Sequence, residues 1–72
     1  MSQVPISDDV IRLGQFLKLS GLADSGAQAR EMLEDGAVTV NGEDESRRGR
    51  QLHRGDVVMV DLPGGQVTAT VG

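Results

Sequence analysis

The sequence contains no cysteine, tryptophan or tyrosine, and its single aromatic residue is Phe16. Without cysteine, disulfide bonds are excluded. With only one histidine in addition, the usual structural and catalytic zinc sites cannot be assembled. Phe16 is expected in the core, so the chain also lacks the exposed aromatic platforms on which many single-strand-binding proteins stack bases.

Long apolar runs are absent as well. No stretch approaches the roughly 20 consecutive apolar residues that a membrane span requires, and residues 1–11 carry Asp8 and Asp9 where a signal peptide would be basic. We therefore expect a cytoplasmic protein that makes no membrane contact. Its 72 residues predict a single domain, 1–72, whose core uses nearly every apolar side chain. Few remain to line a pocket, so neither a cofactor nor a small-molecule substrate is expected.

Charge is unevenly distributed. The formal net charge of −4 argues at first against nucleic acid, because neutralisation of phosphates by Lys and Arg supplies most of the non-specific affinity. Residues 47–54, however, contain four arginines and no acid, so that the rest of the chain has three bases against eleven acids. The sequence therefore indicates a bipolar molecule with one basic segment.

A first helix is predicted to begin at Ser7 or Asp8, either of which can cap it, and to end at Ser20-Gly21. Residues 1–7, which precede it, are predicted to form a short extended segment. Polar residues at positions 12, 15 and 18 are expected to face outward. Apolar residues recur three and four positions apart on the opposite, buried face: Val10, Leu13, Phe16 and Leu17.

A second helix has a clearer start. Ser25 followed by Gln28 matches a capping box, in which each side chain accepts a hydrogen bond from the other residue's backbone N–H. Gly36 marks its end. The buried stripe is expected to consist of Ala29, Met32 and Leu33.

After Gly36 the pattern becomes that of strands. Val38 and Val40 alternate with Thr39 and lead into an Asn41-Gly42 turn. Residues 43–50 are predicted to form an exposed loop or a weak edge strand, and Leu52 should anchor the region that follows. Two further strands, over 57–62 and 67–71, are separated by Pro63-Gly64-Gly65. The fold class is therefore α+β.

This order of elements, together with several local sequences, resembles the RNA-binding domain named after ribosomal protein S4. The resemblance covers about Arg12 to Val60 and is sharpest where Val40-Asn41-Gly42 is followed thirteen residues later by Gly55-Asp56. Within that superfamily the segments 25–29 and 45–48 are most similar to small stand-alone bacterial proteins of the YbcJ type.

The resemblance implies a helical hairpin packed on a small antiparallel sheet, the alpha-L RNA-binding motif, with RNA held along the second helix and the loop after the Asn-Gly turn. Two positions depart from the wider family. Gly26 stands where many members have an arginine after the capping serine, and Gly14 stands where an aspartate is common.

The residues themselves suggest a phosphate site. Ser25 and Gln28 mark a helix N-terminus, whose free N–H groups and dipole attract anions, and Arg30 lies about one turn further along. Guanidinium groups can grip two phosphate oxygens at once. The basic segment supplies four of them: Arg47, Arg48, Arg50 and Arg54. We therefore predict a non-catalytic protein that binds structured RNA, ribosomal or transfer RNA, through its phosphates.

Simpler interpretations exist for most of these residues. Ser25 and Gln28 are fully explained as a cap, and Arg30 could pair with Glu34 at helical spacing. His53 could be plain polar surface. Glu43, Asp44 and Glu45 could hold a cation such as magnesium, but solvated carboxylates that repel misplaced RNA are the better expectation. The Arg54-Gly55-Asp56 tripeptide is best interpreted as a turn into a strand.

Two other functions compete with RNA binding. A protein-interaction module could dock its basic loop on an acidic partner. An enzyme is the weakest alternative, because no set of nucleophile, base and orienting group is evident. A monomer is expected, since Phe16 and the valines are needed inside.

Overall fold

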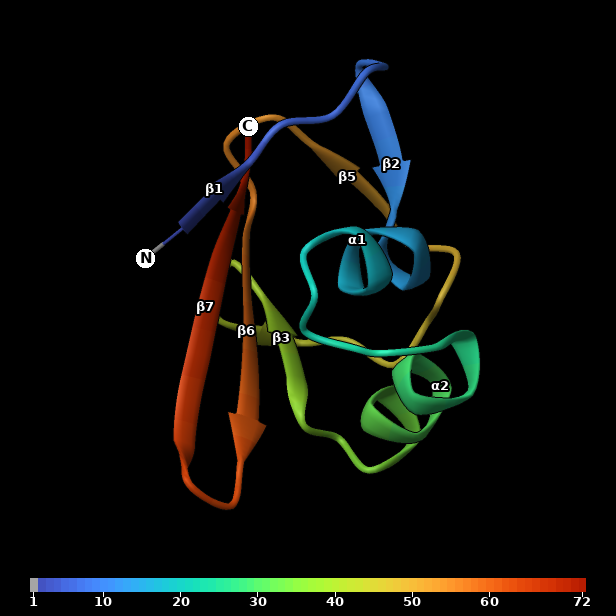
Figure 1. The fold of residues 1–72 in the computed structure, drawn as a ribbon, viewed down its shortest axis with the longest axis vertical. Coiled ribbons are helices and arrows are strands. Elements are labelled where there is room, and N and C mark those ends of the chain that lie inside the picture. The colour runs from blue at the N-terminus through green and yellow to red at the C-terminus, as the bar shows by residue number, and fades with distance from the viewer. Residues whose placement is uncertain (1) are drawn as a thin grey trace.

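The computed structural model describes residues 2–72. Two helices and seven strands follow one another along the chain (Figure 1). The elements are β1 (Ser2–Val4), β2 (Val10–Arg12), α1 (Leu13–Leu19), α2 (Gly26–Glu34), β3 (Val38–Val40), β4 (Glu43–Asp44), β5 (Gln51–His53), β6 (Val57–Leu62) and β7 (Gly65–Val71). No helix among the described residues is long and apolar enough to cross a lipid bilayer.

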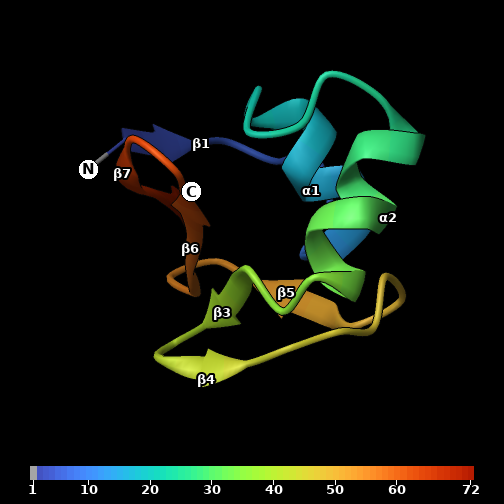
Figure 2. The ribbon, with the colours of Figure 1, turned by 90° about the horizontal axis from the view of Figure 1, so that it is seen from below.

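The α+β class is confirmed, and the sheet is mixed. Five strands pair in the order β1-β7-β6-β3-β4, and all neighbours are antiparallel except β1 and β7, which run parallel. β2 and β5 form a separate antiparallel pair. Seen from below, α1 and α2 lie together on one side of the molecule, with the β6–β7 hairpin opposite them (Figure 2). The last strand starts at Gly65, two residues before the predicted boundary.

The core lies between the helix pair and the sheet. It includes Phe16, which is fully buried, so the prediction for the one aromatic residue is confirmed. Leu13 and Leu17 of the first predicted face are also buried, whereas Val10 is only half-buried. The predicted faces of the second helix and of the strand at 38–40 are buried, as is Leu52, the expected anchor. Apolar residues from all four regions thus form one continuous cluster.

The predicted start of the first helix was wrong. Residues 10–12 form β2, in which Ile11 faces Leu52 of β5 in register, and the helix begins only at Leu13. Helical spacing of Val10 with Leu13 was compatible with either structure, and strand pairing with a segment forty residues away decided the outcome. The predicted end was correct, because Ser20 caps α1 and Gly21 has a φ of +80°.

The second helix agrees with its prediction. The Ser25 side chain accepts a hydrogen bond from the backbone N–H of Gln28 at 3.1 Å. The Gln28 side chain in turn accepts from the N–H of Asp24, one residue earlier than a strict capping box requires. The helix ends at Asp35, and Gly36 follows with a φ of +73°.

The Asn41 side chain joins two turns that are distant in sequence. Asn41 and Gly42 both have positive φ and turn the chain from β3 into β4. The amide Nδ2 donates to Asp56 at 3.1 Å, and Oδ1 accepts from the N–H of Val57 at 2.9 Å. The Asp56 carboxylate also accepts from the backbone N–H of His53. The spacing between Asn41-Gly42 and Gly55-Asp56 therefore corresponds to a side-chain contact between the two turns, which joins Asn41 to Asp56, 15 residues later.

Asp56 is ionised more readily than usual. Partial burial on its own would raise its pKa, but the hydrogen bonds from His53 and Asn41, and the charges of His53 and Arg50, outweigh burial and lower it. The Asn41 contact is thus a charge-assisted hydrogen bond.

Substitutions at Asn41 should separate the side-chain contacts from the backbone conformation. Asn41→Gly removes both side-chain hydrogen bonds and should lower the free energy of unfolding by about 1–2 kcal/mol. Asn41→Ala should cost up to about 1 kcal/mol more, because its φ of +53° disfavours a side chain that cannot hydrogen-bond locally. Urea unfolding of both variants measures the two effects, and equal values would contradict the backbone contribution.

Candidate nucleic-acid interface

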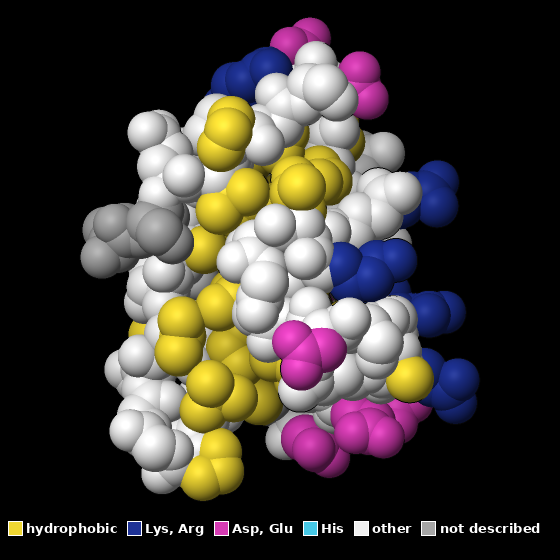
Figure 3. All heavy atoms as spheres, in the orientation of Figure 1, with side chains coloured by type: hydrophobic (Ala, Val, Ile, Leu, Met, Phe, Trp, Pro, Cys, Tyr) yellow, Lys and Arg dark blue, Asp and Glu magenta, His cyan; other side chains and the backbone are white. Residues whose placement is uncertain are grey.

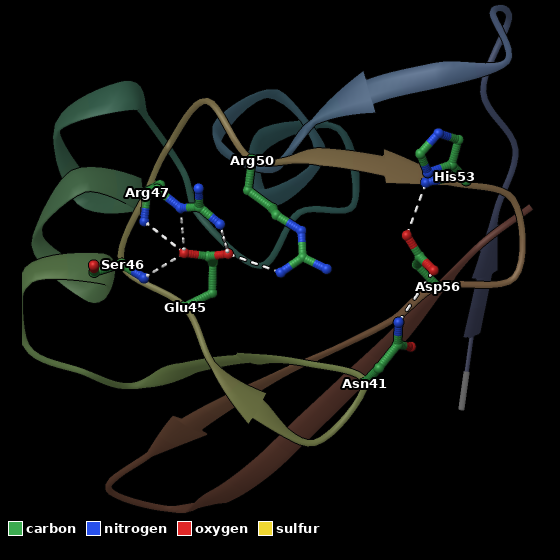
Figure 4. Close-up of polar contacts among 7 residues, drawn as sticks. All are labelled: Asn41, Glu45, Ser46, Arg47, Arg50, His53 and Asp56. Carbon is green, nitrogen blue, oxygen red and sulfur yellow. Dashed lines mark hydrogen bonds and ion pairs between the residues drawn. The ribbon is translucent and has the colours of Figure 1, made fainter.

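A buried carboxylate organises the arginine loop, which we define as residues 45–50. Glu45 Oε2 accepts hydrogen bonds from the backbone N–H groups of Ser46 and Arg47, and from Arg47 Nε. Its Oε1 accepts from Arg47 Nη2 at 3.1 Å and from Arg50 Nη1 at 2.8 Å. Both guanidinium groups converge on this carboxylate (Figure 4). One acid therefore neutralises part of the charge of two arginines.

The carboxylate is held in its ionised form. Hydrogen bonds from Arg47 and Arg50 lower the pKa of Glu45 to about 2, and they outweigh the opposing effect of burial. The same contacts raise the pKa of Arg47. Glu45 is therefore charged throughout the physiological pH range.

Two further predicted arginines are also paired with acids. Arg30 Nε lies 3.1 Å from Glu34 Oε1, the helical pair considered from the sequence. Arg54 Nη1 lies 2.8 Å from Asp9 Oδ1, and its Nη2 donates to the carbonyl of Ile6. Of the five arginines predicted to bind RNA, only Arg48 makes no ion pair within residues 2–72.

Arg48 lies in a groove with the other two unpaired cations of the described chain, Arg12 and Lys18. This groove, which we call the basic groove, runs between α1, the start of α2 and the arginine loop, and has a volume of about 380 Å³. The remainder of its lining is uncharged: Gly14, Gln15, Gly26, Ala29 and Gly49. Three cations without acidic partners thus face one hollow that contains no acid.

Backbone hydrogen bonds fix the arginine loop against the start of α1. Arg12 is the N-cap of that helix but provides no side-chain cap. The N–H groups of Leu13 and Gly14 instead donate to the carbonyls of Arg50 at 2.8 Å and Arg48 at 3.0 Å. These bonds satisfy N–H groups that a helix start otherwise leaves unpaired. They also bring Arg48 beside Arg12, although the two are far apart in sequence.

Gly14 lies next to Arg48, and a side chain at this position would make ordinary contact with it. A Cβ atom at this position would lie 3.4 Å from the Cβ of Arg48 and 3.8 Å from its Cγ. A longer side chain would extend into the basic groove. Because position 14 has no side chain, α1 places no carboxylate beside Arg48.

A second hollow on the arginine loop differs in its charge. It is wider, about 710 Å³, and its arginines are Arg47 and Arg50, both bound to Glu45. Asp56 contributes a carboxylate to its lining. The arginine loop therefore separates a hollow with unpaired cations from one whose arginines are both paired with Glu45.

The remaining predicted residues do not line the basic groove. Ser25 Oγ and Gln28 Oε1 accept hydrogen bonds at the start of α2, and it is the neighbouring Gly26 and Ala29 that form the wall of the groove. Arg12 and Lys18 were not among the predicted site residues, because isolated bases in a helical pattern look like ordinary solvated surface. One available signal was the stretch 10–23, which contains both bases and no acid.

The prediction for the acidic residues at 43–45 was wrong for one of them, Glu45. Glu45 is buried and ion-paired, so it is not the solvated, RNA-repelling carboxylate that was predicted, whereas Glu43 and Asp44 are exposed on β4. No group of three or more His, Cys, Asp or Glu that could hold a metal occurs in the described part of the chain. Arg54-Gly55-Asp56 does form a turn before β6, with Gly55 at a φ of +96°.

The charge separation is visible on the molecular surface. Lys and Arg side chains gather along the edge formed by the two helices, and acidic side chains lie below them, near the end of α2 (Figure 3). The net negative charge of the chain therefore does not describe the edge that carries the basic groove.

The pH dependence of stability should reveal the Glu45 network. Because the folded-state pKa of about 2 lies below the ordinary value of 4.5, the stabilisation is complete above pH 4.5 and is lost as pH falls toward 2. Glu45→Gln should lower the free energy of unfolding at pH 7 by roughly 2 kcal/mol. Urea unfolding at several pH values should show the difference between the two proteins shrinking below pH 4.5. A difference that does not vary with pH would contradict the assignment.

Comparison with known proteins adds independent information. The family model described as "S4 domain" matches residues 4–69. A probable ribosome maturation protein, RlbA, of Bacillus subtilis (strain 168) is 45% identical over 58 residues, which cover 81% of this chain and 82% of that protein.

Among solved structures, the 30S ribosomal protein S4e from Thermoplasma acidophilum shares the fold, with a TM-score of 0.56 and 21% identity. The similarity covers 89% of this chain but only 38% of that protein, so the chain corresponds to well under half of it. The extent of the family match and the identity to the Bacillus protein together show that the chain belongs to the S4 domain family.

Proposed function

We propose that this protein is a non-catalytic RNA-binding module that holds the backbone of a structured RNA in the basic groove. The observation that supports this most directly is the placement of charge. Of the seven Lys and Arg residues, the three without an acidic partner within residues 2–72 line one groove, and no acid lines it. That arrangement suits a polyanion better than a small ligand or an acidic side chain.

The chemistry of the groove favours phosphate. Arg12 and Arg48 can each offer two parallel N–H donors to phosphate oxygens, and Lys18 adds a point charge. Gly26, the first residue of α2, lies in the wall, so the positive end of that helix dipole adds to the same field. Phe16 is buried and the chain has no Trp or Tyr, so the basic groove offers no aromatic side chain for base stacking. Recognition should depend on backbone shape, which favours folded or double-stranded RNA.

Ribosomal RNA is the proposed ligand, with transfer RNA as the second candidate. The Bacillus relative is named for ribosome maturation, and the structural neighbour is a ribosomal protein. A cytoplasmic location and a monomeric state accompany this proposal. Of the other predicted residues, Ser25, Gln28, Arg47 and Arg50 are assigned a secondary role in RNA binding. Arg30 and Arg54 are assigned none, because their charges are paired with Glu34 and Asp9 away from the lining of the basic groove.

Two variants with equal charge provide the main test. Lys18→Gln with Arg48→Gln removes two groove cations, and Arg30→Gln with Arg54→Gln removes two paired cations elsewhere. The groove variant should lose at least about tenfold in affinity for ribosomal RNA, and its log-log salt slope should fall by about 2. The control should lose much less. Fluorescence anisotropy with a labelled ribosomal RNA hairpin, across a salt series, measures both quantities.

A competition experiment tests which RNA is preferred. Transfer RNA and a single-stranded oligouridine of equal length should compete less well than the structured ribosomal RNA. Equal losses in the two charge variants would overturn the groove assignment. If no RNA binds, but an acidic protein partner remains bound after nuclease treatment, the protein-interaction alternative would be supported instead.

A second test uses Gly14. Gly14→Asp places a carboxylate near Arg48 and should weaken RNA binding roughly tenfold by occupying that cation and repelling phosphate. Stability should not fall, because an aspartate in the first turn of α1 suits the helix dipole and replaces a poor helix former. Gly14→Asn is the uncharged control and should bind more tightly than Gly14→Asp. Thermal unfolding, measured on the same samples, separates the two effects.

A further inference from the structure

Glu45 is an unusual residue for an RNA-binding loop. It is the one charged side chain that is buried within residues 2–72, with an exposed fraction of 8%. Its carboxylate lies inside the loop that carries half of the six arginines, where a negative charge should oppose the approach of RNA. Because burying an unpaired charge is very costly, its five hydrogen bonds are needed to keep it there.

These hydrogen bonds determine the course of the arginine loop. Two of them come from the backbone N–H groups of Ser46 and Arg47, so the carboxylate fixes the main chain as well as the side chains. A turn follows immediately, in which the N–H of Arg50 donates to the carbonyl of Arg47 at 3.3 Å. Glu45 therefore holds the loop at both ends of the Arg47–Arg50 turn.

Arg48 lies between the two held arginines. Its carbonyl accepts from Gly14, and that of Arg50 accepts from Leu13, so α1 fixes the opposite side of the same turn. Arg47 and Arg50 direct their guanidinium groups to Glu45 and line the second hollow, while Arg48 lines the basic groove (Figure 4 shows the first two). The turn thus sends consecutive arginines to different sides of the loop.

We propose that Glu45 is a positioning residue for RNA binding: by holding Arg47 and Arg50, it fixes the turn that places Arg48 in the basic groove beside Arg12 and Lys18. This inference rests on the proposed function. It predicts a change in RNA affinity opposite to the change expected from net charge. Removing this acid makes the protein one unit less negative, which by charge alone should strengthen RNA binding, but the loss of loop geometry should weaken it.

Three variants separate geometry from charge. Glu45→Gln removes the charge and keeps the size. Glu45→Asp keeps the charge but is too short to reach both guanidinium groups while holding the backbone. Glu43→Gln, at an exposed position two residues earlier, changes the net charge as Glu45→Gln does. Both Glu45 variants should bind a labelled ribosomal RNA hairpin at least about fivefold more weakly, as expected for coupled neighbours. Glu43→Gln should bind equally or more tightly.

A double-mutant cycle with Arg48 distinguishes positioning from general loss of structure. If Glu45 acts through Arg48, then Glu45→Gln should have little effect on affinity when Arg48 is already glutamine, whereas the effects of Glu45→Gln and Lys18→Gln should remain nearly additive. Circular dichroism and amide NMR spectra, recorded well below the unfolding temperature, confirm that each variant is folded. Glu45→Asp provides the same cycle if Glu45→Gln does not fold.

The outcomes of the two proposals are distinguishable. Suppose that the unaltered protein binds RNA through Lys18 and Arg48, and that Glu45→Gln and Glu45→Asp bind equally well. The positioning role of Glu45 would then be wrong, but the basic groove would still be the RNA-binding site. If affinity falls equally in the presence and absence of Arg48, Glu45 has only a structural role. If the unaltered protein does not bind structured RNA at all, the proposed function itself fails.

Discussion

The backbone N–H groups at the start of α1 are satisfied by the arginine loop. Because Arg12 provides no side-chain cap, Leu13 and Gly14 donate to the carbonyls of Arg50 and Arg48. An unpaired N–H at this position would be costly away from water, so the helix and the loop depend on each other. This contact brings together three segments, the end of β2, α1 and the arginine loop, and with the adjacent start of α2 they form the walls of the basic groove.

The arginine loop shows why counting charges along a sequence is a poor measure of binding capacity. The segment 47–54 has a formal charge of +4, but Arg47 and Arg50 share the carboxylate of Glu45, and Arg54 pairs with Asp9. Only Arg48 remains unpaired there. The other unpaired cations, Arg12 and Lys18, lie outside this segment. The cations that can bind a polyanion are therefore Arg12, Lys18 and Arg48, not the predicted cluster of four arginines.

The parts of the fold that were predicted correctly depend on local sequence. The Ser25–Gln28 cap, the glycines after both helices and the Asn41-Gly42 turn each involve residues within four positions of one another. The β2–β5 pair was missed because it joins residues about forty apart, and the spacing of Val10 with Leu13 also fitted a helix. Glu45 was misjudged for a related reason. Its burial depends on where the loop folds, and a run of three acids gives no indication of which one turns inward.

The segregation of charge also has a consequence for the rate of association. The basic groove lies at the helical edge and has no acid in its lining, whereas the eleven acids of the chain lie outside it. A polyanion that approaches from the groove side is attracted, and one that approaches from an acidic side is repelled and turned away. An overall negative charge of −4 is then compatible with binding a polyanion, since it disfavours encounters at the acidic parts of the surface more than at the groove.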